Sequence, residues 1–110
     1  MRVLAIESSC DETAAAVVTD GHLIESNIVA SQSELHAQYG GIVPEVAARA
    51  HLGSIIPVVR QALADAHVEW QDLDVISATR GPGLPSALVV GFGVARSLAF
   101  GLGLPFVPVD

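Results

Sequence analysis

The chain has 110 residues, of which 51% are hydrophobic and 15% are charged. This length fits one domain, and so much apolar sequence must be covered by the chain's own fold or by a partner. The formal net charge of −7, with only five basic residues, excludes a protein that holds nucleic acid by electrostatic attraction alone.

The single cysteine excludes an internal disulfide bond. The first nine residues carry one arginine and too short an apolar run for a secretory signal peptide. We therefore expect a cytoplasmic protein.

The first thirty residues predict three strands. Residues 2–7 are aliphatic and flanked by polar residues, and residues 14–19 and 23–30 form two further strand-like runs. Asp20-Gly21 separates those two runs and suits the positive φ angles of a tight hairpin turn. An antiparallel meander is expected.

The remainder predicts helices that alternate with strands. One helix begins at Pro44, and Pro57 is expected to kink it or to mark its boundary. Residues 75–79 predict a strand, residues 85–100 a helix and residues 104–109 a further strand. The result is a single α/β domain, residues 1–110, with a mixed sheet and flanking helices. The element order matches one half of an actin-like, or ribonuclease-H-like, fold.

Residues 84–109 form the most apolar run and are long enough to span a bilayer. Arg96 near the middle of the run would oppose insertion, and Pro105 and Pro108 would break its far end. We expect a buried helix of a soluble domain and no membrane contact.

The second helix carries a stripe of small residues spaced four apart. Such a ridge lets another helix approach closely, and its alternative role is burial against the domain's own sheet. We call it the small-residue stripe; its members are Ala87, Gly91, Ala95 and Ala99.

Residues 7–13, ESSCDET, place hydroxyls and carboxylates between the first two predicted strands. Such a turn can cradle an anion or position a nucleophile, and its alternative is a polar hairpin whose side chains bond their own backbone. Cys10 has no nearby base and is expected to pack as a small hydrophobe. Residues 81–83, GPG, follow a strand and precede a helix, but they lack the lysine of a phosphate-binding loop.

The four histidines predict no metal site of their own. His36 and His51 have neither a metal-ligand spacing nor a helical i, i+4 relation, and His22 and His67 are expected near surface turns.

Three spaced motifs carry a resemblance to a known family. ESSCDET at residues 7–13, YGGIVPE at residues 39–45 and GPGL at residues 81–84 occur in an order that resembles the TsaD family of tRNA threonylcarbamoyladenosine transferases. The resemblance covers essentially the whole chain. It implies an actin-like fold of two lobes, of which this chain is the N-terminal one.

The resemblance also implies a reaction: transfer of threonylcarbamoyl from threonylcarbamoyl-AMP to N6 of the adenosine adjacent to the anticodon in tRNAs reading codons that begin with A. The family holds iron or zinc through an HxxxH histidine pair and a distant aspartate. No HxxxH is present in this sequence. Because those ligands and the C-terminal lobe are absent, we expect the chain alone to be inactive.

By the resemblance, Asp11 and Glu12 are the catalytic candidates, with Ser9 beside them as a substrate-binding hydrogen-bonding group. Asp11 is the favoured general base or substrate positioner. The implied partners are a TsaB-type paralogue, paired through helices of the lobe and the small-residue stripe, and TsaE in bacteria. A homodimer of the chain is also expected, and the alternative function is a non-catalytic TsaB-like interaction module.

Overall fold

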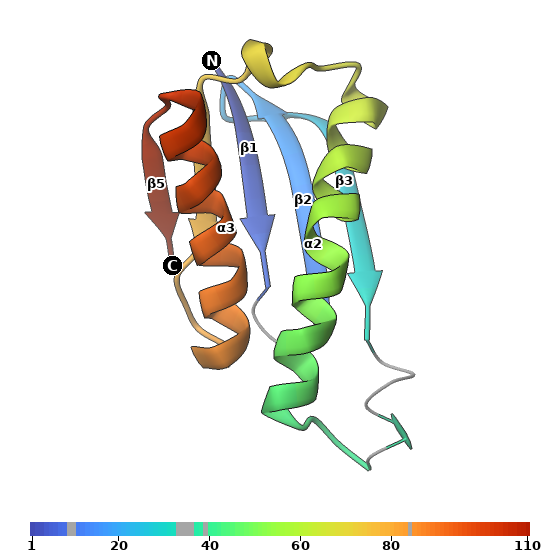
Figure 1. Ribbon diagram of the computed structural model, residues 1–110. Coiled ribbons are helices and arrows are strands. Elements are labelled where there is room, and N and C mark those ends of the chain that lie inside the picture. Colours follow the sequence, from blue (N-terminus) through green and yellow to red (C-terminus); the bar gives the residue numbers. More distant parts are fainter. Residues whose placement is uncertain (9–10, 33–36, 39, 84) are drawn as a thin grey trace.

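The computed structural model describes residues 1–8, 11–32, 37–38, 40–83 and 85–110. One layer is a five-stranded sheet of order β3-β2-β1-β4-β5, and the other is formed by two long helices (Figure 1). The strands are β1 (Arg2–Glu7), β2 (Glu12–Thr19), β3 (Leu23–Ser31), β4 (Val75–Thr79) and β5 (Phe106–Val109). The helices are α2 (Pro44–Ala66), α3 (Pro85–Leu102) and the short 3-10 helix η1 (Trp70–Asp72).

The sheet is mixed, as the sequence predicts. Strands β1, β2 and β3 pair antiparallel, whereas β4 pairs parallel with β1 and β5 pairs parallel with β4. The hairpin between β2 and β3 turns at Asp20 and Gly21, which have φ angles of 55° and 75°. Both angles lie in the left-handed region that the Asp-Gly dipeptide favours, so the predicted meander is confirmed.

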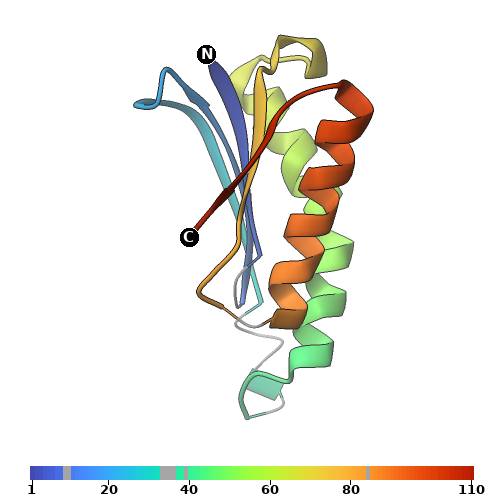
Figure 2. The same cartoon turned by 90° about the vertical axis from the view of Figure 1, so that its left-hand side faces the viewer.

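Both long helices lie on the same face of the sheet (Figure 2). This face is apolar because alternate residues of each strand point toward the helices, among them Leu4 and Ile6 of β1. Ile55 and Val59 of α2 meet them and are almost fully buried. Within the part of the chain that the structure describes, no helix covers the opposite face of the sheet, and Val29, Val107 and Val109 are exposed.

Helix α2 does not end at Pro57, so of the two alternatives expected there, a kink or a boundary, the boundary is wrong. The proline lies on the exposed side of the helix, and Gly53, whose carbonyl loses its usual backbone donor, is also exposed. Water can satisfy that carbonyl, which removes the main reason for a break.

The small-residue stripe of α3 is buried inside the domain, with Ala87 and Ala95 fully inaccessible to solvent. The stripe packs α3 against α2 and the sheet, so its assignment as a partner surface is wrong and the alternative of internal burial is confirmed. Helix α3 is long and apolar enough to cross a membrane. In the structure, the face of α3 that carries the small-residue stripe covers β1 and β4.

Candidate functional site

Ser8, which directly follows β1, lies at the end of the sheet where parallel strands β1 and β4 finish. Helix α2 and helix α3 both begin at the same end (Figure 1). Ligands of open α/β sheets bind outside the carboxyl ends of the parallel strands, so this end is the candidate site.

Ser8 ties the end of β1 to α3. Its hydroxyl donates to the carbonyl of Ala87 at 2.6 Å and accepts from the backbone N–H of Gly91 at 2.9 Å. The hydroxyl therefore bonds a carbonyl and an N–H that lie four residues apart in α3, the spacing at which a helix normally pairs these groups. A Cβ at position 91 would overlap Ser8 Oγ, so only glycine allows this approach.

Thr13 ties the start of β2 to α2. Its hydroxyl oxygen lies 2.7 Å from Nδ1 of His51, and both residues are fully buried. Which of the two atoms donates depends on the tautomer of the imidazole. His51 is thus held inside the domain and cannot touch a substrate from this position.

The candidate carboxylates lie between these two attachments. Asp11 is half-buried, and its carbonyl accepts a 2.7 Å hydrogen bond from the N–H of Gln32. Glu12 is exposed and pairs with Ser31 across the β2–β3 ladder. Strand alternation places the side chain of Glu12 opposite that of Thr13, away from the helices. Ser9, the third candidate, and Cys10 lie outside the described residues.

Strand β4, which precedes the GPG turn, is anchored at the same end. Arg80 donates from Nε and Nη2 to the two carboxylate oxygens of Asp110, both at 2.9 Å. This bidentate bond lowers the pKa of Asp110 and raises that of Arg80. It links the end of β4 to the end of β5 beside the candidate site.

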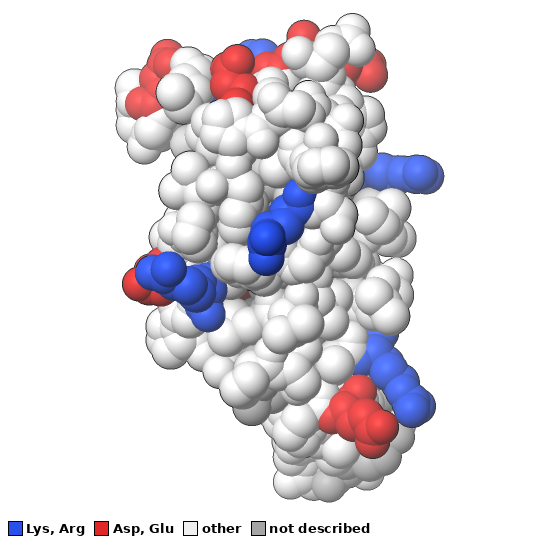
Figure 3. All heavy atoms as spheres, turned by 60° about the vertical axis from the view of Figure 1, so that its left-hand side comes forward, with Lys and Arg blue, Asp and Glu red and all other residues white. Residues whose placement is uncertain are grey.

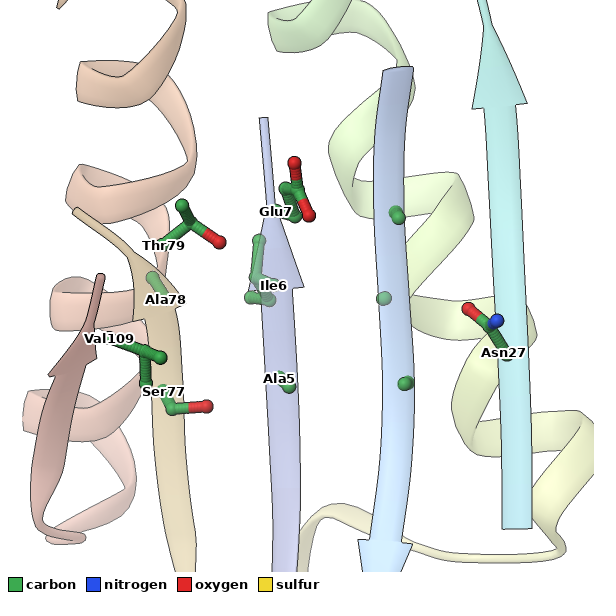
Figure 4. A pocket seen from close by; sticks show the side chains of 11 residues that line it. Ala5, Ile6, Glu7, Asn27, Ser77, Ala78, Thr79 and Val109 are labelled. Carbon is green, nitrogen blue, oxygen red and sulfur yellow. The ribbon is translucent and has the colours of Figure 1, made fainter. Parts of the chain in front are cut away.

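A hollow of about 220 Å³ lies on the uncovered face of the sheet (Figure 4). Small side chains such as Ala5 form its floor, and Asn27 and Val109 lie along its sides. Glu7 and Thr79 stand at the end where β1 and β4 finish. The carboxylate of Glu7, the first residue of ESSCDET, and the hydroxyl of Thr79, which the sequence analysis did not single out, therefore line one hollow.

Among the residues that the structure describes, no three His, Cys, Asp or Glu side chains form a group that could hold a metal ion. His22 and His67 are exposed near turns, as expected, and His51 is bonded to Thr13. The described residues of this chain therefore do not fit the iron or zinc that the resemblance implies.

Sequence reasoning did not identify the roles of Ser8, Thr13 and His51. The alternation of buried and exposed residues along the strands could have indicated them. Ser8 continues the buried face of Leu4 and Ile6, and Thr13 lies two residues before buried Ala15. Polar residues on a buried strand face need hydrogen-bond partners, which here come from the helices.

Comparison with protein families gives a match over residues 23–110. A family model described as "TsaD: tRNA N6-adenosine threonylcarbamoyltransferase" matches residues 23–110. Curated proteins with that same description are 60% identical in Geobacter sp. (strain M21) and 56% identical in Syntrophus aciditrophicus (strain SB). They cover 100% and 99% of this chain, which spans 32% of each relative.

Comparison with solved structures identifies proteins that share the fold of this chain. YeaZ from Pseudomonas aeruginosa superposes with a TM-score of 0.73 at 26% identity, covering 100% of this chain and 45% of that chain. A second structure, described as similar to peptidase YEAZ from Pseudomonas aeruginosa, gives a TM-score of 0.72 at 26% identity, over 99% of this chain and 43% of its own. The sheet order, helix placement and these neighbours establish an actin-like α/β fold.

Proposed function

Because the chain belongs to the TsaD family of tRNA N6-adenosine threonylcarbamoyltransferases, we propose that it forms the N-terminal lobe of an enzyme with that activity. The observation that carries this proposal is 60% identity over all 110 residues of the chain. The chain spans about a third of the length of that relative, so the rest of the catalytic apparatus would come from sequence beyond the matched region. A reaction on tRNA would take place in the cytoplasm.

The proposed reaction is acyl transfer to an exocyclic amine. The N6 amine of adenosine attacks the carbamoyl carbonyl of threonylcarbamoyl-AMP, the bond from that carbon to the phosphate oxygen breaks, and AMP leaves with the electron pair. The amine nitrogen must then lose a proton. Asp11, directly before the start of β2, is the proposed base or positioning group.

Glu12 is exposed beside Asp11 and is the second proposed contact to substrate. Ser9 is retained as a substrate-binding residue by resemblance. Iron or zinc, if the full protein uses it, would be held by residues outside this chain and would polarise the carbonyl. No role in metal binding is assigned to the described residues.

The test compares the chain with a chimera in which it replaces the matching N-terminal third of the Geobacter sp. relative. Each protein is incubated with threonylcarbamoyl-AMP, tRNA and purified TsaB- and TsaE-type partners, and modified adenosine is measured by mass spectrometry. The proposal expects product from the chimera and none from the chain alone. A folded but inactive chimera would overturn it.

The outward sides of α2 and α3 are the proposed surface for a TsaB-type partner, in place of the buried stripe. Leu52 of α2 and Val89 of α3 are 65% and 68% exposed, and Phe100 is 91% exposed. A hollow of about 540 Å³ runs along α3 beside Val89, Phe92 and Arg96. Figure 3, viewed from the side of α3 and β5, shows only isolated charges across the middle of that face.

This apolar face also supports the second candidate function. In that alternative, the chain is a non-catalytic module that pairs through its helices as a TsaB-like protein would. The similarity to YeaZ favours this second function only through the fold that the two proteins share. Light scattering of the chain with and without a TsaB-type protein distinguishes a heterodimer from a homodimer of the chain. A heterodimer supports the partner surface, whereas a homodimer that excludes the partner supports self-association.

A further inference from the structure

Two buried side chains connect the candidate carboxylates to the start of α2. We propose that Thr13 and His51 act as positioning residues that fix Asp11 and Glu12 for the transfer reaction. The inference rests on the proposed function and adds two residues to the site that it describes. Neither residue touches solvent, so neither is a catalytic residue.

The histidine occupies a position where an apolar side chain would be expected. His51 precedes Ile55 and Val58 on the buried face of α2, at helical spacing. An apolar residue there would pack against the sheet but would offer Thr13 no partner. The imidazole instead makes a directional 2.7 Å hydrogen bond in a site closed to water, which fixes the orientation of the Thr13 side chain.

A second attachment to the same helix lies one turn earlier. The N–H of Gln32 donates to the carbonyl of Asp11 at 2.7 Å, and Nε2 of Gln32 donates to the carbonyl of Ala47 at 3.3 Å. Ala47 and His51 are four residues apart in α2 and both are fully buried. The segment from Asp11 to Thr13 is therefore attached to two successive turns of one helix.

This arrangement holds the backbone on both sides of Glu12 and leaves Asp11 half-buried. Glu12 lies between the two attachment points and is exposed. Supporting groups of this kind typically change activity by about tenfold to a hundredfold when they are removed, because the reacting groups lose their alignment. A role in packing alone would instead change the folded fraction and leave the rate per folded molecule unaltered.

The first experiment tests positioning in the chain itself. Thr13→Val removes the hydroxyl and keeps the shape, and Thr13→Ser keeps the hydroxyl. The matched control is Ser26→Ala, which removes a buried 2.7 Å bond from Ser26 Oγ to the carbonyl of Ala62 farther along α2. NMR should show broadened amides at Asp11 and Glu12 in Thr13→Val, whereas these amides should stay sharp in Thr13→Ser and Ser26→Ala. Amides at Asp11 and Glu12 that are as sharp in Thr13→Val as in Thr13→Ser would overturn the inference.

The second experiment measures transfer in the chimera with the Geobacter sp. relative. Thr13→Val should lower kcat by about tenfold to a hundredfold with a smaller change in KM for threonylcarbamoyl-AMP. Thr13→Ser should stay near the parent rate, and His51→Asn, which keeps a polar group near the Nδ1 position, should recover part of the rate lost in His51→Ala. Ser26→Ala should lose stability without losing kcat.

The outcomes separate this inference from the function on which it rests. A folded parent chimera without activity would remove the proposed function, whatever the NMR result. An active parent whose Thr13→Val variant keeps its kcat per folded molecule would overturn the positioning role and leave the proposed function intact. Equal losses of kcat in Thr13→Val and Ser26→Ala would likewise assign Thr13 to packing alone.

Discussion

Replacement of Gly91 by alanine is a direct test of how the end of β1 is held. Alanine normally stabilises a helix interior by about 0.8–1.0 kcal/mol relative to glycine. Here its Cβ would overlap Ser8 Oγ, and because Ser8 is only 2% exposed its hydroxyl cannot move into solvent. Overpacking costs about 1–3 kcal/mol, and a buried hydroxyl that loses its bonds costs about 1–3 kcal/mol more.

The free energy of unfolding should therefore fall by about 1–5 kcal/mol in Gly91→Ala, once the helix gain is subtracted. Urea unfolding followed by the fluorescence of the single tryptophan, Trp70, measures this value. Gly93→Ala is the matched control, since no atom beyond its chain neighbours and the nearby helix backbone lies within 4 Å of its added Cβ. That variant should be stabilised by about 1 kcal/mol.

A double variant identifies the clashing atom. Ser8→Ala removes Oγ, so Ser8→Ala/Gly91→Ala should be more stable than Gly91→Ala alone. Recovery will be incomplete because the Cβ of residue 8 lies 3.2 Å from the added Cβ. If Gly91→Ala is as stable as Gly93→Ala, the close approach of β1 to α3 is refuted.

Three further predictions concern charge, pairing and catalysis. Hydrogen bonding from Arg2 lowers the pKa of Glu25 below its ordinary value of 4.5, so the stability it contributes is present above that pH and is lost as the pH falls through the lowered pKa. An Arg2→Gln variant should lose this acid dependence in urea titrations between neutral pH and pH 3. Phe100→Ser should weaken heterodimer formation in light scattering while leaving the unfolding free energy unchanged, because the side chain is 91% exposed; intact pairing would move the interface elsewhere. In the chimera, Asp11→Asn should lower kcat by about a hundredfold or more if Asp11 removes the proton, with unchanged transfer contradicting that role.

Local patterns were sufficient to predict most of the secondary structure. The Asp-Gly turn and the apolar runs on either side of it placed β2 and β3, since both signals lie within a few residues of the elements they specify. Helix α3 continues two residues beyond the predicted end, to Leu102. The short helix η1 was missed because three residues carry too little pattern to be distinguished from a loop.

The site was less predictable because its contacts join residues distant in sequence. Thr13 and His51 are 38 positions apart, and Ser8 and Gly91 are 83 apart. The spacing of the small-residue stripe indicated close packing, but not whether a partner or the domain's own strand would approach. The structure shows that the strand end at Ser8 approaches it.

Single-turnover transfer by the chimera tests the central claim most directly. The acceptors would be a tRNA with adenosine beside the anticodon and the same tRNA with guanosine at that position. If the chain supplies the N-terminal lobe of a threonylcarbamoyltransferase, one threonylcarbamoyl group will be added to that adenosine and none to the guanosine variant. A folded chimera that modifies neither tRNA, or both equally, would contradict the account.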